Sequence, residues 1–281
     1  MLIVRSVTAL ITGSCLTAAG FLCAPASIAN EAIGQDKARI KLGAGSQYWN
    51  YQEWSKSGAE LNQESGLLAA KVLELNLPVA EYPALFFDFE YSGVTGNISY
   101  EGATQSGVRL LTDTDENVTR VSFAARKRLS NDYSLSVGVE SRRWQRDIRP
   151  TLTTLALSEH YDFNGITFSA GHQTMLNDWT LEITGRGVWW LSSSVAIDLR
   201  EVGFGEIVIP LKDGYSVGAS LAASYAISEA WRLEGEYHVE RLYFPYSDAV
   251  SVSNGQRSSS FSEPEITHLM HTATVSLVYF W

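Results

Sequence analysis

Cysteine is nearly absent from this chain of 281 residues, which holds two. Both, Cys15 and Cys23, lie within the first 29 residues, a segment with the features of a secretory signal peptide. The remainder of the chain contains no thiol. Disulfide bonds and thiolate chemistry are therefore excluded for residues 30–281.

Long apolar runs and basic charge are also scarce. After the N-terminal segment, no stretch approaches about 18 unbroken apolar residues, so the sequence predicts no membrane-spanning helix. Without the first 29 residues, and Arg5 among them, 20 basic residues face 31 acidic residues, a net charge of −11. This balance disfavours nucleic acid as a partner. Motifs for phosphate, zinc or serine-hydrolase chemistry are missing too, and we expect no cofactor and no metal site.

The N-terminus has the three parts of a signal peptide. Arg5 supplies positive charge, Val7 to Ala24 are largely apolar, and Ser27-Ile28-Ala29 has small residues at the cleavage spacing. We expect cleavage after Ala29, and an uncleaved membrane anchor is the alternative. The predicted organisation is a signal peptide at 1–29 followed by a single domain at 30–281.

The C-terminal segment 265–281 alternates in polarity. Counted back from the end, every second residue is apolar or aromatic, beginning with Trp281, Tyr279 and Leu277. The other face is mostly polar, with Phe280 near its tip. A period of two with one apolar face predicts a half-buried strand. The segment resembles the C-terminal strand of bacterial outer-membrane β-barrels, so we interpret Trp281, Phe280, Tyr279 and Leu277 as a signal for the barrel assembly machinery.

The same alternation recurs along the chain, for example in Trp179, Leu181 and Ile183. Short turns are expected at 78–83, 130–132, 177–178 and 228–230, and longer polar loops at 50–66, 93–117, 147–165, 192–214 and 246–264. The predicted strands are 38–49, 67–77, 84–92, 118–129, 133–146, 166–176, 179–191, 215–227, 231–245 and 265–281. The sixth is expected to extend back through Leu155 and Leu157 if the third loop is a protruding hairpin.

These features predict an all-β fold: a closed antiparallel transmembrane β-barrel of about ten strands, with short periplasmic turns and long outer loops. Alternation alone also fits a soluble β-sandwich. The terminal strand, the export signal and aromatic residues at strand ends favour the barrel. The expected aromatic girdles comprise Tyr82, Tyr133, Trp179, Trp231 and Trp281 near the short turns, and Tyr48, Tyr91, Trp189, Tyr243 and Phe244 near the outer ends.

Charged residues of both signs occupy the polar faces of the predicted strands. They are Glu74, Asp88, Glu90, Arg120, Arg126, Arg128, Glu140, Arg142, Glu182, Arg186, Arg232, Glu234, Glu236 and Glu240. A barrel of ten strands lies near the size that side chains fill. We therefore expect a cross-strand ion-pair network and little or no constitutive pore.

Glu236, His238 and Glu240 share one strand face, and a His–carboxylate pair is able to bind a metal or transfer a proton. The favoured interpretation is an ion-pair ladder with arginines such as Arg232, because spacing within one strand is no metal signature.

Three further groups of residues are candidates for chemistry. Asp113, Asp115, Glu116 and Asn117 resemble half of a calcium loop, although a solvated acidic loop is favoured. His160 lies with Glu159 and Asp162 in the predicted third loop. His172 has no evident partner, and His268 and His271 are expected on opposite faces of their strand.

The layout is similar to that of the omptin family of outer-membrane proteases. Short local matches are Glu64-Ser65-Gly66, Asp132-Tyr133-Ser134-Leu135 and Gly214-Tyr215-Ser216-Val217. In that family an Asp pair faces an Asp–His pair across an outer cleft. Asp113 and Asp115 are the candidates for the first pair. The fourth loop region has Asp198 and Asp213 but no His, so water activation has no matching base and protease activity is not expected.

We therefore predict a non-catalytic outer-membrane barrel with a largely filled polar lumen, whose surface loops contact ligands, lipopolysaccharide or envelope partners. One alternative is an outer-membrane hydrolase, either an omptin-like protease or a lipid A-modifying enzyme, with His160, Asp113, Asp115 and His238 as candidate catalytic residues. Another is a narrow channel. We expect a monomer in the outer membrane that contacts membrane lipid and the assembly machinery.

Overall fold

The computed structural model describes residues 37–103, 109–130, 132–152 and 154–281. The predicted signal peptide lies outside these residues. The strands are β1 (Arg39–Trp54), β2 (Glu60–Val79), β3 (Tyr82–Ala103), β4 (Arg109–Arg128), β5 (Tyr133–Ile148), β6 (Leu157–Leu176), β7 (Trp179–Leu199), β8 (Gly205–Pro210), β9 (Gly214–Ala226), β10 (Trp231–Phe244), β11 (Val250–Ser253), β12 (Ser258–Phe261) and β13 (Glu265–Phe280). A single 3-10 turn, η1 (Arg200–Val202), occurs in this part of the chain.

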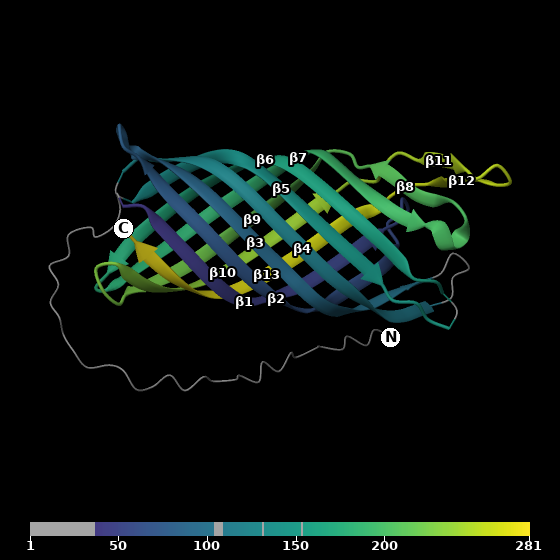
Figure 1. Ribbon diagram of the computed structural model, residues 1–281, viewed down its shortest axis with the longest axis horizontal. Helices are drawn as coiled ribbons and strands as arrows, with labels where there is room; N and C mark the ends of the chain where they lie inside the picture. Colours follow the sequence, from purple (N-terminus) through teal and green to yellow (C-terminus); the bar gives the residue numbers. More distant parts are fainter. Residues whose placement is uncertain (1–36, 104–108, 131, 153) are drawn as a thin grey trace, which may run out of the picture. The chain divides into compact units, whose positions relative to one another are not determined.

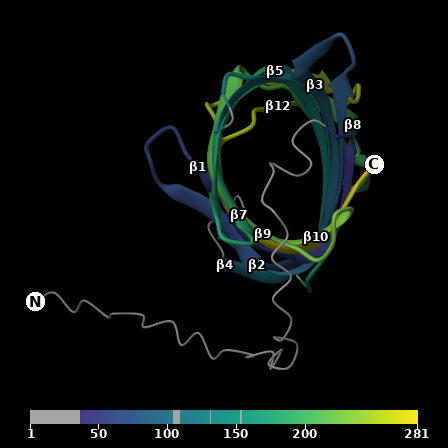
Figure 2. The same ribbon diagram turned by 90° about the vertical axis from the view of Figure 1, so that its left-hand side faces the viewer.

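Ten of these strands close into an antiparallel barrel. Their order is β6-β5-β4-β3-β2-β1-β13-β10-β9-β7, and β6 pairs with β7 to complete the ring (Figure 2). The first and last strands pair along their whole length, from Arg39 opposite Phe280 to Trp54 opposite Glu265. Closure gives every spanning strand a hydrogen-bonded neighbour on both sides, as hydrocarbon requires. The predicted fold class and strand number are confirmed. No helix in the described residues is long and apolar enough to cross a membrane.

The apolar face of each strand points out of the barrel. Leu221 is 56% exposed and Leu277 is 43% exposed, although both are aliphatic. Aromatic residues border this apolar band as predicted: Tyr133, Trp179 and Trp231 near the short turns and Trp189 near the outer end are all exposed. Phe244 is an exception, because it is fully buried inside the barrel and its assignment to a girdle was wrong.

The strands are longer than predicted at their outer ends. β3 continues to Ala103, β4 begins at Arg109, and β7 continues to Leu199, so most of the predicted loop residues 93–117 and 192–199 are strand. β6 begins at Leu157, which makes the third loop a protruding hairpin. The paired strands therefore rise well beyond the apolar band, toward the end that carries β8, β11 and β12 (Figure 1).

The opposite end carries the short turns. β6 and β7 are joined by Asn177 and Asp178 alone, and Asn177 has a φ of 57°. Asparagine tolerates this left-handed conformation better than most residues, which suits it to a tight hairpin. The predicted turn at 177–178 is confirmed.

A charged substitution on the outward face tests the orientation of the strands. Leu221→Arg places a cation in the middle of the apolar band, and we expect it to destabilise the folded barrel by about 2–4 kcal/mol. Leu152→Arg is the control, since Leu152 is also exposed but lies in the outer turn between β5 and β6, outside the apolar band. Urea unfolding in phospholipid vesicles measures both. Equal stability of the two variants contradicts the orientation.

Candidate functional site

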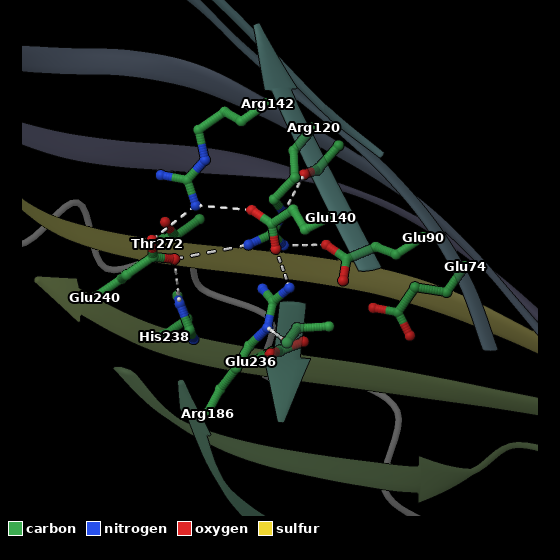
Figure 3. A network of polar contacts seen from close by, with 12 residues as sticks. Glu74, Glu90, Arg120, Glu140, Arg142, Arg186, Glu236, His238, Glu240 and Thr272 are labelled. Carbon is green, nitrogen blue, oxygen red and sulfur yellow. Dashed lines mark hydrogen bonds and ion pairs between the residues drawn. The ribbon is translucent and has the colours of Figure 1, made fainter. Parts of the chain in front are cut away.

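The lumen within the apolar band is crossed by ion pairs. Arg142 contacts Glu140 at 3.0 Å and Glu240 at 2.7 Å, and so joins β5 to β10 across the barrel (Figure 3). Arg186 also binds Glu140, and Arg120 binds both Glu90 and Glu240. The predicted inward charges therefore do form a cross-strand network. Each buried charge has a partner of opposite sign, which offsets the cost of desolvation.

A second group of ion pairs lies closer to the short turns. Lys41 contacts Glu74 at 2.6 Å, Glu236 at 2.9 Å and Glu234 at 3.0 Å, and it is almost fully buried. A cavity of about 290 Å³ lies beside these groups. Its lining extends from Arg126 near the short turns to Trp49, Val118 and Met270. The lumen is therefore partly open on the side of the short turns.

Apolar side chains close the outer end of this cavity. Trp49, Phe163, Trp190 and Phe244 are buried to 2% exposure or less, and Phe163 lies 5.0 Å from Phe244 between ring centroids. We call the following buried set the aromatic plug: Trp49, Tyr51, Trp144, Tyr161, Phe163, Trp190, Phe244 and His268. The rings of Trp49 and His268 are in contact, with centroids 3.8 Å apart and planes tilted by 58°. The plug fills the barrel where the strands leave the apolar band.

Arg146 lies at the level of the plug beneath the outer rim. Its Nε is 2.9 Å from Glu64 Oε1, and its Nη1 is 3.0 Å from Glu53 Oε1 and 2.7 Å from Glu159 Oε2. The Tyr161 hydroxyl lies within hydrogen-bonding distance of two carboxyl groups, 3.1 Å from Glu159 Oε2 and 2.7 Å from Glu263 Oε1. Together with Glu116, which accepts a hydrogen bond from Trp144, these residues form what we call the Arg146 cluster.

The Arg146 cluster has more carboxyl groups than cations. Its five glutamates, Glu53, Glu64, Glu116, Glu159 and Glu263, are each 8% exposed or less. Burial, together with the neighbouring carboxylate Glu64, raises the pKa of Glu116 well above its ordinary value. Burial and the neighbouring Glu53 raise the pKa values of Glu159 and Glu263 as well. Several of these groups therefore hold protons under conditions in which a solvated glutamate is ionised.

The candidate acids Asp113 and Asp115 do not face the barrel interior. Both lie in strand β4, not in an acidic loop as predicted, and they share the outward face of that strand. Asp115 pairs with Arg149 at 2.8 Å, and this hydrogen-bonded partner lowers its pKa. Glu116 points inward instead. The resemblance to half of a calcium loop is therefore wrong, because strand geometry separates the oxygen atoms onto two faces.

His160 lies in β6 rather than in a loop. Its side chain is exposed on the outward face, whereas Glu159 beside it is buried in the Arg146 cluster. Across the β6–β7 pair, His160 lies close enough to Asp198 to influence that carboxylate. Arg200, bound directly to Asp198, is the main reason that the pKa of Asp198 falls to about 2. The sequence offered no sign of the proximity of His160 and Asp198, because cross-strand register was unknown.

His238 and the two glutamates beside it face the lumen as predicted, and Glu240 pairs with arginines as expected, through Arg142 and Arg120. Glu236 binds Lys41, and His238 lies 3.5 Å from Glu240. Arg232, the arginine named as an example, donates a hydrogen bond to Thr180. In the described part of the chain, no group of three or more His, Asp or Glu residues is arranged to hold a metal ion.

The remaining histidines are divided between the two faces of the wall. His268 is buried in the plug and His271 lies outside, where Tyr237 contacts its Nδ1 at 2.6 Å, so their predicted separation is confirmed. His172 does have a neighbour, since its ring lies 4.6 Å from that of Tyr133. None of these histidines adjoins Asp113 or Asp115 within the described contacts.

Removal of the single cation from the Arg146 cluster tests its structural importance. We expect Arg146→Met to destabilise the barrel by about 3–5 kcal/mol, because buried carboxylates lose their partner. Arg149→Met is the matched control, since it breaks a solvent-exposed pair on the same strand end and should leave stability unchanged. Unfolding midpoints in vesicles compare the two, and an equal loss in both variants refutes the role given to Arg146.

The raised pKa values also predict a pH dependence. Because the folded state binds these protons more tightly than the unfolded state, their contribution to stability is full below about pH 4.5 and is lost as the pH rises through the folded-state pKa values. We expect the outer halves of β4, β5 and β6 to exchange backbone hydrogens faster at pH 8 than at pH 5, after correction for intrinsic rates. Glu263→Gln should weaken this difference. Equal protection at both pH values contradicts the prediction.

Comparison with solved structures shows which known fold this chain resembles. No family model and no curated protein matches this sequence. The outer-membrane protease OmpT from Escherichia coli is similar in structure, with a TM-score of 0.67 at 13% identity over 88% of this chain and 97% of that chain. The translocator domain of the autotransporter NalP from Neisseria meningitidis gives a TM-score of 0.44 at 13% identity over 87% and 88% of the two chains. The chain thus has the fold of a bacterial outer-membrane β-barrel in the predicted omptin-like layout.

Proposed function

We propose that this chain is a non-catalytic integral protein of the bacterial outer membrane, which presents its raised outer strands and loops to ligands, lipopolysaccharide or envelope partners. The observation that carries the proposal is the filled outer half of the barrel. There, the aromatic plug and the Arg146 cluster occupy the interior, and the candidate acids Asp113 and Asp115 face outward. An exposed wall, rather than an internal cleft, is the surface offered to other molecules.

Several features of the outer part support a role in contact. Ionic groups are abundant on its outward faces, as in the pairs Arg143–Asp162, Arg149–Asp115 and Lys212–Asp248. These pairs are solvent-exposed and contribute little to stability. They supply both charges for recognition of polar partners, including the phosphate groups of lipopolysaccharide.

An outer-membrane hydrolase is the second candidate function. The similarity of fold to an outer-membrane protease agrees with it, but fold alone does not carry activity. The specific observation in its favour is the proximity of His160 and Asp198 on the outward face of the β6–β7 pair. Because Arg200 already occupies the carboxylate, this pair is poorly arranged to activate water.

Detergent-purified protein incubated with lipid A and a peptide library tests the two candidates. We expect no product by mass spectrometry, and no difference between wild type and the variants Asp113→Ala, Asp115→Ala and His160→Ala. A product formed by wild type and lost in His160→Ala, but kept in His271→Ala, overturns the non-catalytic proposal and supports the hydrolase.

Conductance in planar bilayers tests the narrow-channel alternative. We expect a flat current trace, because the aromatic plug closes the lumen. Stepwise conductance supports a narrow channel instead.

A further inference from the structure

The membrane-facing wall contains an apolar groove. It has a volume of about 730 Å³ and crosses β4, β5, β6 and β7. One cross-strand row runs along it from Lys127 through Leu135 and Ala170 to Gly185, in direct register from strand to strand. Small residues occupy one end of this row and a cation occupies the other. The volume lies within the ~300–1,000 Å³ of pockets that hold small molecules.

The groove slants through the apolar band. Lys127 is next to the last residue of β4, directly beside a short turn, and Leu135 lies two residues after Tyr133 at the start of β5. Gly185 lies instead about midway between Trp179 and Trp189, which mark the two borders of the band on β7. The row therefore rises from the border on the side of the short turns toward the middle of the membrane.

The glycine that deepens the groove has no packing reason within the protein. A Cβ atom built on Gly185 meets no atom within 4 Å, and one on Gly187 meets only a backbone oxygen at 3.8 Å. Glycine weakens a strand interior relative to residues with side chains. A larger residue would fit at either position, so the empty space is available to a molecule outside the chain.

The cationic end of the groove is also available to bind a molecule outside the chain. Lys127 is exposed on the outward face and forms no ion pair within the described residues. Several other outward-facing cations of the barrel are paired with acids, as Arg109 is with Glu101, Arg143 with Asp162 and Arg149 with Asp115. An unpaired ammonium group at the membrane border attracts anionic lipid headgroups.

We propose that the groove binds one phospholipid of the periplasmic leaflet, with its phosphate on Lys127 and an acyl chain lying over Ala170 and Gly185. This inference rests on the proposed membrane location. The polarity of the groove selects the molecule: the charge lies at the side of the short turns, which is the periplasmic side in this fold, and the apolar part points into the bilayer. A lipid of the opposite leaflet would enter with its headgroup at the wrong end.

Native mass spectrometry tests the site. Wild-type protein is reconstituted in vesicles of equal parts phosphatidylethanolamine and phosphatidylglycerol, released in mild detergent, and examined for retained lipid. We expect one retained phospholipid, with phosphatidylglycerol preferred. Gly185→Leu should lower the retained fraction about tenfold, and Lys127→Gln should abolish the preference for the anionic lipid.

Matched controls separate the groove from the rest of the wall. A Cβ on Gly235 also meets nothing within 4 Å, but Gly235 lies on β10 outside the groove, so Gly235→Leu should retain lipid like wild type. Lys71 is an outward lysine on β2, remote from the groove, and Lys71→Gln should keep the preference. Folding of each variant is checked by urea unfolding.

Three results overturn the inference. Equal retention in Gly185→Leu, Gly235→Leu and wild type means that the groove is not the site. A lipid-free wild type that has inserted into vesicles means that no such site exists, although the membrane location stands. A wild-type dimer that Gly185→Leu dissociates means that a second copy covers the groove. Failure of wild type to insert at all refutes the membrane location itself.

Discussion

Backbone hydrogen bonding in hydrocarbon is the constraint from which this structure follows. No water is present in the bilayer core to pair with N–H and C=O groups, so a sheet that spans it has no free edge. The chain meets this requirement by pairing β1 with β13 along the full length of both strands and β6 with β7. Once the ring is closed, each side chain of a spanning strand points either to lipid or to the lumen. The alternation of apolar and polar residues determines which side each one faces.

The interior of the barrel has two zones, one within the apolar band and one above it. Within the apolar band the inward residues are ionic, and pairs such as Arg142–Glu240 connect opposite walls. Above the band the strands continue into water, and there the interior becomes an apolar core closed by Trp190 and Phe244. The Arg146 cluster belongs to this upper zone, where buried carboxyl groups outnumber their cation. A filled upper zone directs function to the outer surface, which is why we propose contact rather than catalysis.

The lower zone could be predicted well from the sequence. Tyr133 to Val139 alternate with serine and glycine, and one apolar face in a strand means one face in lipid. The outer extensions were harder to predict, because above the membrane the outward face is polar and the pattern loses its apolar signal. Asp113 and Asp115 were therefore predicted to lie in a loop, although both are in β4. Phe244 was predicted to be a girdle residue together with Tyr243. Adjacent residues of a strand point to opposite sides of the wall, however, so only one of the two faces the membrane.

The candidate site was less predictable than the fold, since it depends on register between strands. Arg146 forms ion pairs with Glu53, Glu64 and Glu159 from three other strands, and no local sequence motif predicts these contacts. The lipid groove has the same origin: Lys127 and Gly185 are far apart in sequence and become one row only through three successive pairings. A single alternating strand specifies which way a side chain points, whereas several strands together specify what it meets.

Spin-label accessibility along β9 tests most directly the claim that the apolar side of each strand contacts lipid and the other side faces the lumen. Residues 30–281 contain no cysteine, so Leu221→Cys and Ala222→Cys each provide one labelling site in the processed chain. In vesicles, we expect the label at 221 to be accessible to oxygen and shielded from a water-soluble nickel reagent. The label at 222, which borders the lumen cavity, should show less access to oxygen. Labels at both positions with equal access to both reagents, or a shielded label at 221 in protein that is soluble without detergent, contradict the account.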